Sequence, residues 1–238
     1  MTISKVKAQL KKISKDFALK FDKEWFKHLW ISNRLEILTE YLGTCPDPIY
    51  QKYGKNPNER IRNLDKFVDS RDFKECLKRY GGQVAHRSEL KQEEKWIKQI
   101  NNKKIRKELL EFHAKLKKSF GKAKFLALVT KPRNEKERKW QLSYCIREEW
   151  IHILLDINKI KFQDIKKKYW PYDEGIATYF AFYLENKLNR LEKFRDKEKY
   201  PMEKEYYIYA IKFRQLFKNK KSPEDRKKAL IKLLNSLK

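Results

Sequence analysis

Three side chains that could share a metal ion or a proton are clustered at residues 148–152, in the stretch EEWIH. If this segment is helical, Glu148 and His152 are one turn apart and project from the same face, with Glu149 beside them. A carboxylate and an imidazole on a buried helix face are costly to desolvate unless they are paired or bound to a cation. The spacing therefore indicates a metal site or an ion-paired helix face.

A further carboxylate, Glu174, begins the stretch EGIATYF, 22 residues after His152. The preceding Trp170-Pro171 pair predicts a corner, because a proline restricts the backbone of the residue before it. A helix that starts after this corner can fold back against the first one. Glu148, His152 and Glu174 are then candidate metal ligands, with Glu149 near an open coordination position.

Taken together, the two segments resemble the active-site helices of gluzincin-type zinc metallopeptidases. EEWIH is similar to the HExxH motif with Glu148 in place of its first histidine, and DEGIATYF is similar to the glutamate helix of that family, often EGxAxY. The strand-like stretch FLALVT precedes the first helix, where the family places the last strands of its sheet. The resemblance covers roughly residues 120–217, and residues 1–119 contribute nothing to it.

The resemblance implies a role for each matching residue. Glu149 corresponds to the general base, His152 to the second metal ligand and Glu174 to the third, while Glu148 occupies the first-ligand position. Zinc is the cofactor implied, although two carboxylates and one imidazole also suit the harder ions manganese and iron. In the family a later tyrosine often stabilises the oxyanion, and the candidates here are Tyr206, Tyr207 and Tyr209.

We therefore expect a metal-dependent peptidase or peptidase-like hydrolase that acts on a peptide or protein substrate. A glutamate at position 148 adds negative charge and weakens the Lewis acidity of the metal. Three outcomes stay open: an active peptidase with an unusual ligand, a metal-binding protein with other chemistry, and a peptidase fold that has lost its metal.

A purely structural interpretation also stays open, with residues 147–149 forming a solvated, ion-paired face and His152 packed in a core. A ferritin-like di-iron site requires two ExxH motifs, and none of the other three histidines follows a glutamate by three positions. The sequence therefore argues against that site.

Positive charge dominates the composition, with 59 Lys and Arg against 32 Asp and Glu and a formal net charge of +27. Such a field attracts nucleic acid, anionic membrane surfaces or acidic proteins. The lysines are spread along the chain, and lysine-rich surfaces also occur without a binding role. The alternative function is a non-catalytic, basic, helical protein that binds nucleic acid on a degenerate metallopeptidase fold.

The cysteine content and the hydropathy of the chain indicate where in the cell the protein is expected. Three dispersed cysteines without a CxxC pair argue against a disulfide framework or a cysteine zinc site. No apolar run is long enough to span a bilayer, and the N-terminal segment lacks the apolar core of a secretory signal. We expect a cytoplasmic protein with no membrane span.

Only six glycines and seven prolines interrupt the chain, which favours long helices. The expected fold is α+β and mainly α, with a helical region at 1–119 and a zincin-like region at 120–238 that has a small β element before the metal helix. We expect a strand within 123–132 and an irregular stretch at 43–60. The expected helices are at 3–42 (one or two), 61–80, 88–119 (one helix or a pair) after an N-cap at Ser88, 133–157, 174–195 after an N-cap at Asp173, 202–219, and from Pro223 onward after an N-cap at Ser222.

Overall fold

The computed structural model describes residues 3–22, 29–32, 48–74, 82–130, 135, 145–162, 165 and 167–238. The described part is mainly helical with one small sheet, which confirms the expected α+β, mainly α class. None of its helices is both long enough and apolar enough to cross a membrane.

The chain forms two compact units, and their limits differ from the expected boundary between residues 119 and 120. Unit 1 combines Met1–Phe26 with Leu142–Lys238, and unit 2 is Lys27–Gln141. The first helix accounts for the difference, because its apolar face packs on helices that follow more than 125 residues later in the sequence.

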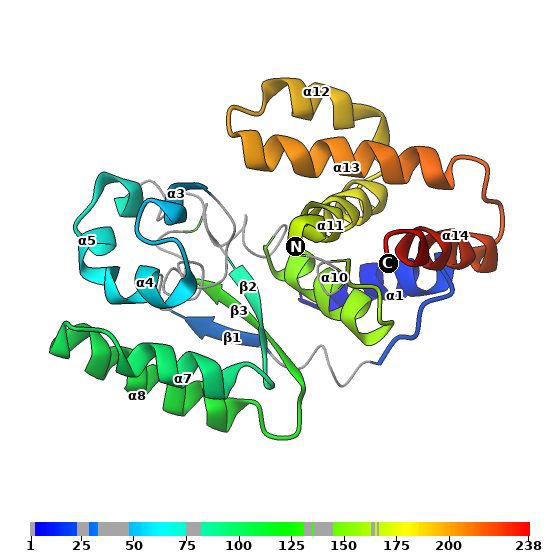
Figure 1. The fold of residues 1–238 in the computed structure, drawn as a ribbon. Helices are drawn as coiled ribbons and strands as arrows, with labels where there is room; N and C mark the ends of the chain where they lie inside the picture. Colours follow the sequence, from blue (N-terminus) through cyan, green and yellow to red (C-terminus); the bar gives the residue numbers. More distant parts are fainter. Residues whose placement is uncertain are drawn as a thin grey trace. The chain divides into compact units, whose positions relative to one another are not determined.

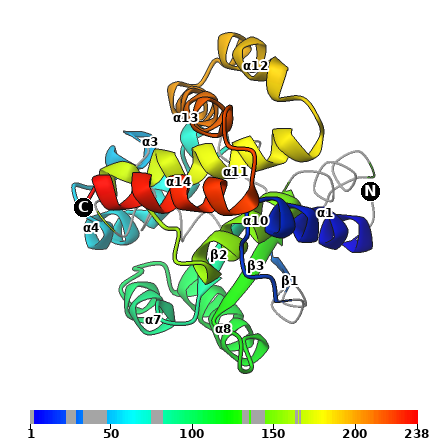
Figure 2. The same cartoon turned by 90° about the vertical axis from the view of Figure 1, so that its right-hand side faces the viewer.

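Unit 1 is helical, and helices α10, α11 and α13 stack in that order with α12 beside α13 (Figures 1 and 2). Its helices are α1 (Ile3–Asp16), α10 (Cys145–Ile157), α11 (Trp170–Leu184), α12 (Leu191–Lys197), α13 (Pro201–Phe217) and α14 (Pro223–Ser236), with short 3-10 helices at Lys167–Tyr169 and Leu188–Arg190.

Helix α1 is held in unit 1 by its apolar face and by contacts at its C-terminal end. The ring of Phe17 is fully buried, with its centroid 4.8 Å from that of Phe180 in α11 and 5.0 Å from that of Phe217 in α13. The hydroxyl of Tyr183 donates to a carboxylate oxygen of Asp16 at 2.7 Å. Both ends of the described chain therefore contribute to one core.

Helices α11 and α13 cross in close contact at Gly175. A Cβ atom built on this glycine would lie 2.2 Å from the Cβ of Tyr209 and 3.1 Å from its carbonyl carbon. No side chain fits at such a distance, so a glycine is required where the two helices touch. The contact fixes α11, which carries Glu174, against α13.

Unit 2 contains a three-stranded sheet with the order β1-β3-β2. Strand β3 (Phe125–Thr130) pairs in parallel with β1 (Leu29–Ser32) and in antiparallel with β2 (Gly82–His86). The described helices of this unit are α3 (Pro48–Gln51), α4 (Pro57–Arg62), α5 (Leu64–Val68), α7 (Leu90–Lys98) and α8 (Lys103–Ser119).

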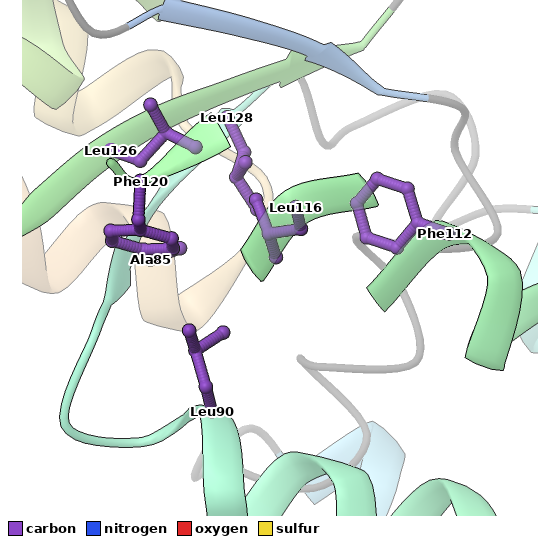
Figure 3. Packing of buried hydrophobic residues seen from close by; sticks show 7 residues of the cluster. All are labelled: Ala85, Leu90, Phe112, Leu116, Phe120, Leu126 and Leu128. Atoms are coloured by element: carbon purple, nitrogen blue, oxygen red, sulfur yellow. The ribbon is translucent and has the colours of Figure 1, made fainter. Parts of the chain in front are cut away.

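One face of the sheet in unit 2 packs on α7 and α8 (Figure 3). Leu126 and Leu128, two residues apart on β3, point to the same side because successive side chains of a strand alternate. They meet side chains from β2, α7, α8 and the turn after α8, namely Ala85, Leu90, Phe112, Leu116 and Phe120. Helix α8 therefore turns one apolar face toward the sheet.

Several local predictions are confirmed. Strand β3 lies inside the expected range 123–132, and the helix expected at 202–219 is α13. The Ser222 hydroxyl accepts a hydrogen bond from the amide of Asp225 at 3.1 Å, as expected for an N-cap.

Other predicted limits are wrong. The segment 88–119 is a helix pair, which was one of the two expected arrangements, but the N-cap of α7 is Glu89 rather than Ser88. The helix expected at 174–195 begins at Trp170 and ends at Leu184, because the backbone turns left-handed at Asn186 (φ 55°). A strand, β1, stands inside the expected helical segment 3–42.

The remaining expected elements are described only in part. The expected helix at 61–80 is seen as the end of α4 and as α5, and residues 75–81 lie outside the described residues. The segment 43–60, expected to be irregular, contains α3 and the start of α4. Most of 131–144 also lies outside the described residues, and α10 covers the rest of the expected helix 133–157.

Candidate metal and acid–base site

Helix α10 carries three of the candidate residues and is held on both sides by apolar packing. Trp150 and Ile153 are almost fully buried, and this packing fixes the helix in the core. Glu149 is also buried, whereas Glu148 and His152 are half-buried and project from the same face, one turn apart.

Helix α11 brings Glu174 to His152. The Oε2 atom of Glu174 lies 3.6 Å from Nε2 of His152, and the exposed fractions of the two side chains are 28% and 19%. Glu174 follows the first turn of α11, which begins at Trp170 rather than after the predicted cap at Asp173. The Asp173 carboxylate is instead buried and accepts a hydrogen bond from the amide of Phe162 at 2.8 Å.

Two carboxyl groups of this cluster, those of Glu148 and Glu149, resist ionisation. Burial, together with the negative charge of Glu174, raises the pKa of Glu148 to about 7. Burial, reinforced by the charges of Glu148 and Glu174, also raises the pKa of Glu149 well above its usual range. These two pKa shifts mean that the folded protein holds protons that an unfolded chain would release at neutral pH.

The pKa of His152 is also raised, but for an imidazole this favours the charged form. Burial disfavours its charged form, but the negative charge of Glu174, followed by those of Glu149 and Glu148, outweighs burial and raises the pKa of His152 to about 10. One imidazolium thus stands among three carboxyl groups, and it is the only basic group of the cluster that these four residues form. A divalent cation that binds these carboxyl and imidazole groups would therefore displace protons.

The three candidate tyrosines of α13 have different surroundings. Burial, followed by the charges of Glu198, Glu148 and Glu203, raises the pKa of Tyr207 to about 12. Tyr207 therefore lies within the electrostatic field of the cluster and keeps its proton as a hydrogen-bond donor at neutral pH.

All three tyrosines face aromatic side chains, and the ring of Tyr207 lies 6.0 Å from that of Phe182 and 6.1 Å from that of Phe194. The ring of Tyr206 meets that of Trp170 edge-on at 5.4 Å, and the ring of Tyr209 packs on Tyr172 at 4.3 Å. The ammonium of Lys212 also lies 4.2 Å from the centroid of the Tyr209 ring. The charge of Glu148 acts on Tyr207.

An ion pair that was not expected from the sequence joins a buried arginine of α10 to the C-cap residue of α11. The Nη2 atom of Arg147 lies 2.8 Å from Oε1 of Glu185, and the Arg147 side chain is only 3% exposed. Glu185 follows Glu174 by eleven residues, or about three helical turns, which is the one signal in the sequence that these glutamates share a side of α11. The positive charge of Arg147 also favours the ionised form of Glu148.

The donor set meets part of the requirement of a divalent metal. Two ligands at about 2.0–2.1 Å from a tetrahedral zinc ion lie roughly 3.3 Å from each other. The 3.6 Å between His152 and Glu174 is close to that separation. Within the described ranges, no group of three His, Cys, Asp or Glu side chains converges closely enough to hold a metal, so Glu148 would have to turn toward this pair.

Comparison of the chain with protein-family models, with curated proteins and with solved structures finds no match, so the function is argued from the site alone.

Proposed function

We propose that the cluster on α10 and α11 is a divalent-cation site of a zincin-like hydrolase that cleaves peptide bonds. The observation that carries the proposal is the approach of His152 and Glu174 from two helices to 3.6 Å, with Glu148 and Glu149 beside them. His152, Glu174 and Glu148 would hold the ion. The proposal is supported by the match between this pair and the ligand spacing of the gluzincin motif.

The chemistry follows from the protonation of the residues. A bound divalent cation lowers the pKa of a coordinated water and polarises a carbonyl group. Glu149 would accept the proton of the attacking water once the charge of a bound cation has displaced the proton that Glu149 holds in the metal-free protein, and would then deliver it to the leaving amine. Tyr207 donates a hydrogen bond to the oxygen that becomes negative.

The metal content of the purified protein tests the proposal. We expect close to one equivalent of zinc, manganese or iron per chain by elemental analysis, and its loss in His152→Ala and Glu174→Ala. His86→Ala removes an imidazole from unit 2, and Glu205→Ala removes an exposed carboxylate from α13, so both control variants should keep the metal. A protein that binds none of these ions would rule out the proposed hydrolase.

Glu148→His tests the unusual ligand. If Glu148 takes the first-ligand position, a histidine there completes a His-His-Glu set, and zinc affinity should rise about tenfold or more while manganese affinity falls. Titration of the metal-free variant with each ion measures both changes. An unchanged zinc affinity would show that residue 148 does not face the ion.

A further inference from the structure

The proposed hydrolase site makes no use of the net charge of +27, and helix α8 places four exposed lysines on one face. Residues 103–124, which span α8 and the turn after it, contain nine Lys and Arg and only two Glu. The amphipathic structure of α8 separates these residues from the core of unit 2.

The inner face of α8 is occupied by the sheet contacts of Phe112 and Leu116 (Figure 3). Lysines on the opposite face repeat at eleven residues, or three turns, so that Lys104 aligns with Lys115 and Lys107 with Lys118. All four side chains are exposed, and the two members of each pair are about 16 Å apart along the helix axis. We call these four residues the α8 lysine face.

The α8 lysine face has few internal partners. Among the described residues, one lysine of α8 forms an ion pair: Nζ of Lys117 lies 3.9 Å from Oε2 of Glu94 on α7. Glu108 and Glu111 are exposed on the same helix, but no ion pair with the four lysines is formed in the described part of the chain. These ammonium groups are therefore available to an external anion.

We infer that the α8 lysine face binds the phosphate backbone of double-stranded nucleic acid without reading its sequence. A duplex carries about one negative charge per 1.7 Å of its axis, so the 16 Å length of the face matches about five base pairs. Lysine contributes point charges that suit phosphate, whereas recognition of bases relies on the planar, bidentate groups of other side chains.

The apolar residues of the surface decide between a duplex and other anionic partners. Single-stranded nucleic acid is held by stacking on exposed aromatic rings, and membrane-surface helices insert apolar side chains. None of the large hydrophobic side chains exposed in the described residues belongs to α7 or α8. A hydrophilic, cationic helix face fits a phosphate backbone best.

The test compares this face with an equally charged region elsewhere. Variant one replaces the four lysines of the α8 lysine face by glutamine. Variant two makes the same change at four exposed lysines in and before α14, namely Lys218, Lys221, Lys228 and Lys232, so that both variants lose the same charge. Fluorescence anisotropy with 25-base-pair duplexes of unrelated sequence, between about 50 and 200 mM salt, measures affinity and its salt dependence.

The expected result is micromolar binding of all duplexes by the wild-type chain. In variant one the slope of log affinity against log salt should be smaller in magnitude by about 3–4, and the affinity at least tenfold weaker. Variant two should weaken binding by less than threefold, and circular dichroism checks that both variants fold.

Four results would overturn the inference: no duplex binding by the wild-type chain, equal losses in both variants, tighter binding to a single strand of the same length, or binding to phosphatidylserine vesicles in place of the duplex. Equal losses would mean that the charge acts diffusely. Because metal content is a separate measurement, failure here leaves the proposed hydrolase site untouched, and the reverse also holds.

Discussion

Gly175→Ala should destabilise unit 1 by about 2–3 kcal/mol, although alanine is a better helix former than glycine. The added methyl group would meet the Cβ of Tyr209 at 2.2 Å and backbone atoms at 3.1 and 3.2 Å, none of which is a flexible side-chain end. Helices α11 and α13 must therefore separate. Thermal unfolding followed by circular dichroism should show a midpoint lower by roughly 10 °C.

Two comparisons test this explanation of Gly175. Gly121→Ala places a methyl group where no atom lies within 4 Å, so its cost should be limited to about 1–2 kcal/mol of backbone strain at φ 48°. In a Tyr209→Gly background the cost of Gly175→Ala should fall to less than half. A Gly175→Ala protein as stable as the wild type would contradict the close crossing.

The stability of the metal-free protein should fall as pH rises from about 5 to 10. The pKa of Glu148 is raised from 4.5 to about 7, so the folded state retains a proton that the unfolded chain loses, and stability decreases across that interval. The pKa of His152 is raised from 6.5 to about 10. The stability that this residue contributes is therefore fully present below about pH 6.5 and is lost as the pH rises to about 10. One pKa unit corresponds to about 1.4 kcal/mol, so the shifts set upper limits of about 3 kcal/mol for Glu148 and about 5 kcal/mol for His152.

A divalent cation should reverse this pH dependence. Metal binding displaces the protons of the cluster, so the stabilisation by added zinc or manganese should grow with pH and reach about 2.7 kcal/mol at a hundredfold excess over the dissociation constant. Melting midpoints between pH 5 and 9, with chelator or with metal, measure both effects. Glu148→Gln should flatten the chelator profile below pH 7, whereas Glu205→Gln on the surface should not. A flat wild-type profile would contradict the proton-holding cluster.

Elements with strong local signals were predictable from the sequence. Ser222 followed by a proline marks the start of α14, and the apolar stretch of β3 is bounded by residues that end a strand. Strand β1 carries no comparable signal, because its conformation depends on pairing with β3, which lies 96 residues later. Pairing at such distance in sequence overrides local propensity.

In the candidate site, too, the features with a local sequence signal were predictable and those that depend on helix packing were not. The one-turn spacing of Glu148 and His152, together with the Trp170-Pro171 corner, predicted that His152 and Glu174 would lie close together. The Arg147–Glu185 pair and the contact at Gly175 depend on how helices cross, which no local pattern encodes. Tyr206 and Tyr207 are adjacent in sequence but about 100° apart around α13, so only the packed structure separates their surroundings.

The burial of Phe17 among residues of α11 and α13 has a consequence for biosynthesis. Helix α1 leaves the ribosome before the whole of unit 2, yet the partners of its apolar face are made more than 125 residues later. During that interval unit 2 can fold alone, while α1 stays exposed and must then close a loop of at least 115 residues. Translation pauses after residue 141 or chaperone capture of the nascent N-terminus should therefore affect unit 1 far more than unit 2.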